Sequence, residues 1–337
     1  MLGLTRFTLC ALVIVNHVWQ PAANMLGFHA VAAFYMTSGY VMTRIIHEVY
    51  GTNAEGIGRF LVNRALRILP AYYVFLALTL LLILLMPAGF GFGRLVAWPQ
   101  TDHDWFANLT LIDLVWAETI VIPPAWSLGI ELLFYVLMPL MLARTAAAVH
   151  VWFAVSLAIT AALLINGLDF GYRYYPAYAA SLFFSLGALC YVQRHRFAAI
   201  RFGVIGFASM LIVFSITPLV SEALGVSHLT WGFYAAAILF TVVLVSADRS
   251  DGLPPGLDKW LGDLCYPMYL AHFLVVAFIA AVSNGGLAFG STEFLVVTFA
   301  VTLFVAGTFV VVLDRPLQRL RARWRPASAL PARPVGA

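Results

Sequence analysis

The chain has 337 residues, of which 63% are hydrophobic and only 10% charged, and its formal net charge is +4. Soluble domains carry about 25% charged residues, so this composition excludes an ordinary soluble domain and indicates a polytopic membrane protein. There is no basic, aromatic-rich patch of the kind that nucleic-acid binders use, and we expect no nucleic-acid partner. The three cysteines are an odd number without metal-ligand spacing, so we expect neither a disulfide framework nor a metal site.

Ten apolar segments are long enough to span a membrane. They predict an all-α polytopic fold, a bundle of about ten transmembrane helices within residues 1–316. Residues 317–337 are expected to form a basic, Pro/Ala-rich cytoplasmic tail. In chain order the segments are 4–21, 28–46, 69–88, 124–143, 149–166, 176–193, 202–219, 230–247, 267–284 and 292–313.

Lysine and arginine are distributed very unevenly between the two sides of this predicted bundle. Sixteen of them lie after even-numbered segments or in the tail, and only Arg94 and Arg173 lie in the other connections. Cytoplasmic connections carry the excess of positive residues, so both termini are predicted to be cytoplasmic. The longest connection on the opposite side, residues 87–123, is rich in tryptophan and acidic residues. Its middle is amphipathic enough to lie on the membrane surface or dip into it.

The first segment carries Arg6 and His17, with Asn16 beside the histidine. Eleven residues correspond to about 20° more than three helical turns, so Arg6 and His17 project from the same face about 16 Å apart. Ionisable groups inside membrane helices are costly and by default mark a functional pathway. The alternative is that Arg6 extends to the membrane interface while His17 lies at the far end of the helix.

Two further polar groupings follow in the chain. Residues 34–44 carry Ser38 and Gly39 in the middle of an apolar segment, which predicts either a polar site or a small-residue packing seam. Arg64 and Arg67 are three residues apart on one helix face. Two forked guanidinium groups suit phosphate recognition, although the same pair could merely satisfy the charge rule for cytoplasmic connections.

Glu131 lies about two turns into the segment that begins at Pro124. This places it about 10 Å below the non-cytoplasmic surface. A carboxylate at that depth must be paired, protonated or used. Because His17 is expected at a comparable depth, the sequence predicts a base-and-orienter pair between His17 and Glu131.

Taken together, these motifs resemble the acyltransferase-3 family of membrane O-acyltransferases. The resemblance begins with the Arg6-to-His17 spacing, residues 34–44, the Arg64–Arg67 pair and the segment 126–135. Residues 261–272 resemble the family's Gly-x-x-Ser-Tyr-x-x-Tyr-x-x-His block, and residues 314–316 resemble its terminal acidic-x-Pro motif. The matches follow the family order from residue 6 to residue 316. Two positions depart from the family pattern: Cys265 replaces a small hydroxyl residue, and Leu132 replaces a second carboxylate.

The resemblance implies transfer of an acyl group, commonly acetyl, from cytoplasmic acyl-CoA to a hydroxyl of a glycan, glycolipid or related acceptor. His17 would be the catalytic base, with Glu131 in the core of the site, and His272 is expected to pack rather than react. The implied localisation is the inner membrane. The donor-side residues would be Arg6, Arg64 and Arg67, and the supporting residues Asn16, Ser38, Trp126, Ser127 and Tyr269.

Two other functional classes remain open at this stage. A glycan or lipid transporter would use the polar interior as a substrate path, and it would move substrate without forming an O-acyl product. A non-catalytic membrane scaffold would tolerate replacement of His17. We predict the O-acyltransferase, acting on a saccharide-type hydroxyl with acetyl-CoA or another acyl-CoA as co-substrate.

Overall fold

The computed structural model describes residues 1–22, 26–85, 96–197, 199–250, 252–283 and 286–324. Its described residues form α-helices with short 3-10 and π segments and contain no β-strand, which confirms the predicted all-α fold. The α-helices are α1 (Leu2–Val18), α2 (Gly27–Ile45), α3 (Ala54–Leu85), α4 (Asp102–Thr110), α5 (Trp126–Leu137), α6 (Ala146–Ile165), α7 (Ala177–Val192), α8 (Val204–Ala223), α9 (Trp231–Ala247), α10 (Pro255–Ser283), α11 (Thr292–Phe309) and α12 (Arg315–Ala322).

The apolar helices account for the predicted membrane spans. Six stretches in the described part of the chain are long and apolar enough to cross a membrane: Ala54–Leu85, Pro123–Leu142, Ala146–Ile165, Val204–Ala223, Pro255–Ser283 and Thr292–Ala322. Three shorter apolar helices, α1, α7 and α9, and the more polar α2 match the remaining predicted spans. Large apolar side chains such as Leu84, Ile165 and Phe304 are exposed on the outside of the bundle, as a lipid-facing surface requires.

Two helices begin well before the predicted spans. α3 starts at Ala54 and α10 at Pro255, and both continue through an internal proline, Pro70 in α3 and Pro267 in α10. The sequence prediction began these spans near the prolines because the preceding turns carry charged residues. Those turns are helical nevertheless. Four of their charged side chains line a polar cavity described below: Arg64, Arg67, Lys259 and Asp263. The first residues of the predicted tail belong to α12, and residues 325–337 lie outside the described residues.

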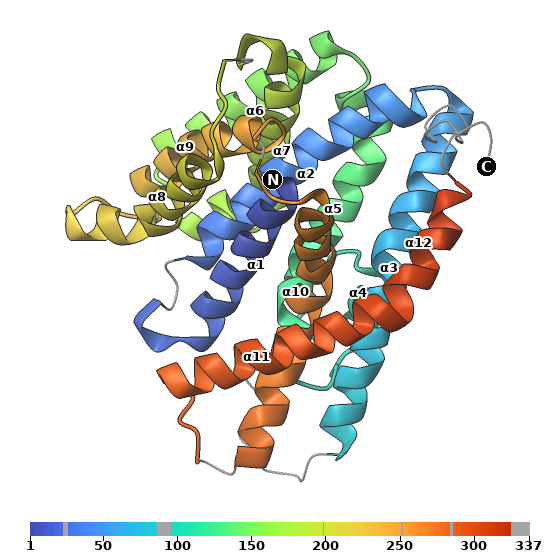
Figure 1. The fold of residues 1–337 in the computed structure, drawn as a ribbon, viewed down its shortest axis with the longest axis vertical. Helices are drawn as coiled ribbons and strands as arrows, with labels where there is room; N and C mark the ends of the chain where they lie inside the picture. Colours follow the sequence, from blue (N-terminus) through green and yellow to red (C-terminus); the bar gives the residue numbers. More distant parts are fainter. Residues whose placement is uncertain (23–25, 86–95, 198, 251, 284–285, 325–337) are drawn as a thin grey trace.

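The bundle is arranged around α1, α2 and α10. In Figure 1, α6–α9 lie to one side of α1 and α2, while α3, α11 and α12 lie to the other side. The α2–α7 and α1–α10 pairs make the most extensive helix contacts. At the α2–α7 crossing the backbones touch, because a Cβ atom on Gly39 would lie 2.0 Å from the Phe184 carbonyl oxygen, and one on Gly187 1.9 Å from that of Met36. Gly39 therefore belongs to a small-residue packing seam.

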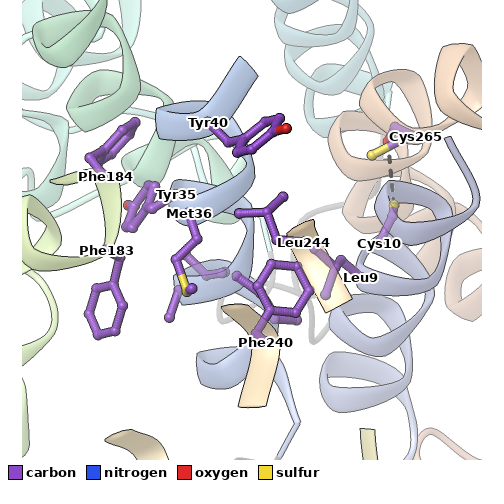
Figure 2. Close-up of a cluster of buried hydrophobic side chains, with 14 of the residues drawn as sticks. Leu9, Cys10, Tyr35, Met36, Tyr40, Phe183, Phe184, Phe240, Leu244 and Cys265 are labelled. Carbon is purple, nitrogen blue, oxygen red and sulfur yellow. Dashed lines mark hydrogen bonds between the residues drawn. The ribbon is translucent and has the colours of Figure 1, made fainter. Parts of the chain in front are cut away.

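The hydrophobic core lies between these central helices. Figure 2 shows aromatic and aliphatic side chains of α1, α2, α7 and α9 packed together, with Tyr35 stacked on Phe184 at a ring-centroid distance of 4.9 Å. Next to this cluster the Cys10 thiol donates to the Cys265 carbonyl oxygen at 3.3 Å. All three cysteines of the chain are free and buried. This core fixes the spacing of α1, α2 and α10, which carry much of the candidate site.

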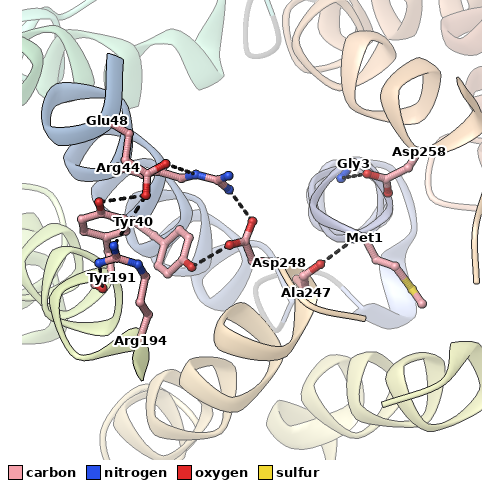
Figure 3. A network of polar contacts seen from close by, with 10 residues as sticks. All are labelled: Met1, Gly3, Tyr40, Arg44, Glu48, Tyr191, Arg194, Ala247, Asp248 and Asp258. Carbon is pink, nitrogen blue, oxygen red and sulfur yellow. Dashed lines mark hydrogen bonds and ion pairs between the residues drawn. The ribbon is translucent and has the colours of Figure 1, made fainter. Parts of the chain in front are cut away.

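A polar network joins the helix ends on the predicted cytoplasmic side (Figure 3). Arg44 at the end of α2 pairs with Glu48 at 3.0 Å and with Asp248 after α9 at 2.5 Å, and Tyr40 donates to the same aspartate at 3.1 Å. Burial alone would raise the pKa of Glu48, but the hydrogen bonds from Arg44 and Tyr191 hold this pKa below its ordinary value. These contacts connect α2, α7 and α9.

The start of α1 is fixed in the same region. The Asp258 carboxylate of α10 accepts the Gly3 and Leu4 backbone N–H groups at 3.0 and 2.9 Å, and the terminal amine of Met1 donates to the Ala247 carbonyl at 2.5 Å. A carboxylate at a helix N-terminus satisfies donors that the helix itself leaves free. Asp258 thereby sets the position of α1 along the bundle axis.

The long connection before α5 folds back onto that helix. Thr101 and Asp104 form a capping box at the start of α4. Asn108 donates to the Thr119 carbonyl at 2.7 Å and accepts from the Val121 N–H at 2.8 Å. The Leu111 carbonyl lies over Gly129, where an added Cβ would be 2.3 Å away. The described part of the connection therefore packs against the first turns of α5.

Candidate active site

Three neighbouring cavities run through the interior of the bundle. The first, which we call the polar cavity, has a volume of about 380 Å³ and lies where α1 and α10 begin and α12 ends. It is lined by Arg6, Thr37, Ser38, Val41, Met42, Arg64, Arg67, Glu131, Tyr135, Lys259, Asp263, Gln318, Arg321 and Ala322.

The second and third cavities continue toward the opposite end of the bundle. The middle cavity has a volume of about 80 Å³ and shares Arg6, Thr37, Ser38 and Glu131 with the polar cavity. The third, the histidine cavity, is also about 80 Å³ and shares Val31 and Tyr269 with the middle cavity. Because neighbours share lining residues, the three cavities lie in series between the arginines and His17.

This series of cavities brings the predicted site residues together. Each of the ten lines at least one of the three cavities, although they come from five helices that are distant in the sequence. Their shared location supports the interpretation of the polar residues as one site. They are Arg6, Asn16, His17, Ser38, Arg64, Arg67, Trp126, Ser127, Glu131 and Tyr269.

The two arginines of α3 lie in the wall of the polar cavity, and only one of them faces a carboxylate. Arg67 faces Asp314 at 3.5 Å. Arg64 donates to the neutral Asn63 side chain at 2.8 Å, and within the described part of the chain its buried Nε has no hydrogen-bond partner. A buried guanidinium without a carboxylate partner is costly, and it is the group that an incoming anion would stabilise.

Glu131 of α5 is held by hydrogen bonds at the junction of the polar and middle cavities. Its Oε1 accepts from the Ser38 hydroxyl at 2.5 Å and from the Tyr135 hydroxyl at 2.6 Å. The predicted direct pairing with His17 is not formed, because His17 lines the histidine cavity, which Glu131 does not reach, and hydrogen-bonds to His272 instead. Glu131 therefore presents its carboxylate to the cation-lined cavity rather than to the histidine.

His17 is paired with a second histidine from α10. Its Nδ1 lies 3.2 Å from His272 Nε2, and the two rings meet edge to edge with nearly parallel planes, at a centroid distance of 5.4 Å and an interplanar angle of 10°. His272 is fully buried, whereas His17 is half-buried and lines the histidine cavity. The sequence did not predict this contact of His272. The α1–α10 crossing brings together residues 255 positions apart in the chain.

Three of the supporting residues lie in the walls of the middle and histidine cavities. Asn16 accepts the Leu26 backbone N–H at 3.0 Å, which ties α1 to the start of α2. Ser127 and Tyr269 share a hydrogen bond of 2.8 Å, and Tyr269 also donates to the Pro124 carbonyl at 3.1 Å. Tyr269 is thus the common wall of two cavities, fixed to the start of α5.

An aromatic cluster lines the outer part of the histidine cavity. Trp126 packs against Tyr174 and Tyr175 with ring-centroid distances of 5.3 and 5.1 Å, and Phe28 contacts Tyr174 at 4.9 Å. Such faces suit stacking against a flat or ring-shaped ligand. Trp126 was predicted from the sequence, but its aromatic partners after α6 were not.

Several other lining residues were missed by the sequence reasoning. Tyr135 lies one turn after Glu131, and this i, i+4 spacing was a usable signal. His272 stood in a noted motif but was assigned only to packing. The remaining cavity residues come from the start of α10 and from α12: Lys259, Asp263, Gln318 and Arg321. Only Asp263 lies within a noted motif, residues 261–272, and it was not singled out there. The described residues contain no group of three or more metal-ligating side chains.

The structure thus combines an apolar helix bundle with a cation-lined cavity and, in series with it, a cavity lined by a histidine. The sequence model of the acyltransferase-3 family, described as an acyltransferase domain, matches residues 2–313. The chain therefore belongs to this family of acyltransferases.

Two curated relatives agree with the family match. The acyltransferase MdmB of Streptomyces mycarofaciens is 25% identical over 346 residues, which cover 91% of this chain and 84% of the relative. YrhL of Bacillus subtilis (strain 168), a proposed peptidoglycan O-acetyltransferase, is 26% identical over 317 residues, which cover 84% of this chain and 49% of the relative. The chain thus spans about half the length of YrhL. No solved structure matches.

Proposed function

We propose that this acyltransferase moves an acetyl or other short acyl group from acyl-CoA to a hydroxyl of a saccharide-type acceptor, such as a glycan or glycolipid. The observation that carries the proposal is the series of adjacent cavities that extends from the arginines of α1 and α3 to His17. The O-acetyltransferase name of YrhL supports a carbohydrate acceptor, and the aromatic wall of the histidine cavity suits the faces of sugar rings.

The donor would enter through the polar cavity. The phosphate groups of CoA are anions, and Arg6, Arg64 and Arg67 line this cavity, two of them on consecutive turns of α3. Forked guanidinium groups bind phosphate oxygens in a bidentate manner. The pantetheine arm, roughly 15–20 Å when extended, matches the axial distance from Arg6 to His17 estimated from helical rise.

The acyl transfer would take place beside His17. The ring nitrogen of His17 takes the proton of the acceptor hydroxyl while the hydroxyl oxygen attacks the thioester carbonyl carbon. The carbon–sulfur bond then breaks, CoA leaves as a thiolate, and the proton on His17 passes to that sulfur. The products are an O-acyl ester and CoA, and the histidine returns to its starting state.

The proposed orientation places both termini in the cytoplasm of a cell with the protein in the inner membrane. Sixteen lysine and arginine residues lie on the same predicted side as the termini. The polar cavity lies at this end of the bundle, so acyl-CoA would arrive from the compartment that supplies it.

The test is acyl transfer by purified protein in lipid nanodiscs, with radiolabelled acetyl-CoA and cell-envelope glycans as acceptors. Wild type should form an O-acyl product, and His17→Ala should lose at least ~10²-fold of the rate, the usual contribution of a positioned base. His150→Ala is the matched control, because His150 is exposed and bonds only at the bundle surface. Translocation of glycan without any acylated product would favour the transporter instead.

A further inference from the structure

The hydrogen bonds of the histidine pair between α1 and α10 determine which ring nitrogen of each histidine carries the proton. His272 Nδ1 lies 3.3 Å from the Met268 carbonyl oxygen, one turn back in the same helix. A carbonyl oxygen only accepts hydrogen bonds, so the proton of neutral His272 belongs on Nδ1. His272 Nε2 then carries a lone pair and accepts, which places a proton on the facing Nδ1 of His17. The remaining ring nitrogen of His17, Nε2, is left with the lone pair that a base needs.

The reverse arrangement is disfavoured by the same contacts. If His272 Nε2 donated to His17, a neutral His272 would have no proton on Nδ1, and its lone pair would face the Met268 carbonyl oxygen. Protonating both nitrogens of His272 would place a charge on a side chain that is fully buried, next to Tyr269 and Phe273 rings at 6.1 and 4.9 Å. Burying an unpaired charge of this kind is costly.

The usual partner for orienting a catalytic histidine is a carboxylate, and Glu131 was the candidate in this chain. Glu131 instead accepts hydrogen bonds from the Ser38 and Tyr135 hydroxyls. We propose that His272 is the positioning residue of this enzyme: a buried neutral imidazole, fixed by the Met268 carbonyl, that holds the tautomer and ring plane of His17 with Nε2 free to act as the base. This inference rests on the proposed role of His17 in acyl transfer.

The first test reads the tautomer directly. ¹⁵N-histidine-labelled protein in nanodiscs is compared by NMR with a His17→Gln sample, which assigns the His17 ring signals by difference. Wild type should show a protonated Nδ1 and an unprotonated Nε2 on His17. His272→Phe keeps a flat ring but removes the acceptor, so the His17 signals should move toward the other tautomer. Unchanged His17 signals in His272→Phe would overturn the inference.

The second test uses a conservative replacement. A glutamine side chain can place its carbonyl oxygen near the position of His272 Nε2, so His272→Gln should retain the wild-type His17 tautomer. His272→Phe should lower kcat roughly ten- to hundred-fold with the KM for acetyl-CoA unchanged, and His272→Gln should be about tenfold more active than His272→Phe, the value of one hydrogen bond. Equal loss in the two variants would contradict a positioning role.

Two controls separate this inference from the proposed function. His150→Gln, at the exposed surface, should leave the His17 signals and kcat unchanged. Thermal unfolding of each His272 variant shows whether the bundle is intact. A fully active His17→Ala would overturn the proposed function, whereas an inactive His17→Ala together with tautomer signals that do not respond to His272 would overturn only the present inference.

Discussion

Glu131 is a half-buried carboxylate that hydroxyl groups hold in place without a short-range ion pair. Two hydroxyl donors, Ser38 and Tyr135, satisfy one carboxylate oxygen. The group faces a cavity whose other walls carry Arg6 and Arg64. A carboxylate held this way partly offsets the positive field without occupying the guanidinium donors, to which we have assigned the phosphate groups of the proposed donor.

Replacing Glu131 by glutamine tests this arrangement. Glu131→Gln keeps the shape and can still accept the two hydroxyl hydrogen bonds, but it loses the charge. We expect acetyl-CoA binding and thermal stability to be retained while kcat falls by about tenfold or more, as for a charge stabilising the transition state. Measuring kcat, KM and the unfolding temperature together distinguishes a role of Glu131 in turnover from a role in the stability of the bundle. A destabilised variant with full specific activity would instead assign Glu131 to bracing the bundle.

Substitution of Arg64 tests the proposal that acetyl-CoA binds in the polar cavity. Arg64→Gln should weaken acetyl-CoA binding by roughly ten- to hundred-fold, because a charged hydrogen bond contributes about 1.5–3 kcal/mol. Arg64→Lys should fall between wild type and Arg64→Gln, since it keeps the charge and loses the fork. Isothermal titration gives the affinities. Arg59→Gln is the control on the same helix, where Arg59 is exposed and pairs with Glu55; equal affinity in all variants would leave Arg64 with no part in binding the donor.

At the scale of helices, α12 closes the polar cavity against α3 and α10. Gln318 donates to Asp314 at 2.6 Å and to Asp263 at 3.3 Å, and the Asn63 side chain donates to the Arg321 carbonyl at 3.0 Å. These contacts make a short basic helix part of the cavity wall. The terminal acidic-x-Pro motif thereby gains a physical role, because Asp314 bonds both Gln318 and Arg67.

The position of α12 predicts a difference between two of its arginines. Arg321 is buried in the cavity wall, whereas Arg319 on the same helix is exposed and does not line the cavity. Arg321→Gln should weaken acetyl-CoA binding several-fold, and Arg319→Gln should leave it unchanged, since screened surface charges contribute little. Parallel titrations of the two variants check this. Equal effects would mean that the general positive charge of the helix, not its place in the cavity, attracts the donor.

The α2–α7 crossing gives a stability prediction. Gly187→Ala would place a Cβ 1.9 Å from the Met36 carbonyl oxygen, and separating two backbones costs typically 1–3 kcal/mol. Gly307→Ala in α11 is the matched control, because no atom lies within 4 Å of the added Cβ and alanine favours a helix over glycine by about 1 kcal/mol. Thermal unfolding in nanodiscs should therefore shift downward for Gly187→Ala and not for Gly307→Ala. A stable Gly187→Ala variant would contradict the close crossing.

Helices that depend on local composition can be predicted from the sequence, whereas contacts that depend on how distant helices cross cannot. Each of the ten apolar runs overlaps a helix in the described part of the chain, because burial in lipid follows local composition. The starts of α3 and α10 were missed, since residues such as Arg64 and Asp263 are polar for a reason that only the assembled cavity reveals. The His17–His272 contact was also missed. It depends on the crossing of two helices that are far apart in sequence, and no local pattern encodes a crossing.

For the whole molecule, the arrangement separates two chemical environments within one bundle. Cations gather at the end where the polar cavity lies, and aromatic rings surround the histidine cavity further along. The middle cavity joins them through Arg6, Glu131 and Tyr269. Acyl-CoA has charged phosphates at one end and a neutral arm that ends in a thioester at the other. Its charge therefore matches the cation-lined polar cavity and its neutral arm the cavities beyond, which is the physical basis for proposing it as the donor.

The most direct test of this account is a cryo-EM structure of the protein in nanodiscs with a non-transferable acetyl-CoA analogue. The account predicts phosphate groups within hydrogen-bond distance of Arg64 and Arg67 in the polar cavity. It further predicts the arm passing Glu131 and Tyr269, with the acyl carbon next to His17 in the histidine cavity. An analogue bound with its acyl carbon outside the histidine cavity, or bound away from the two arginines, would contradict the claim that the three cavities form one acyl-transfer path.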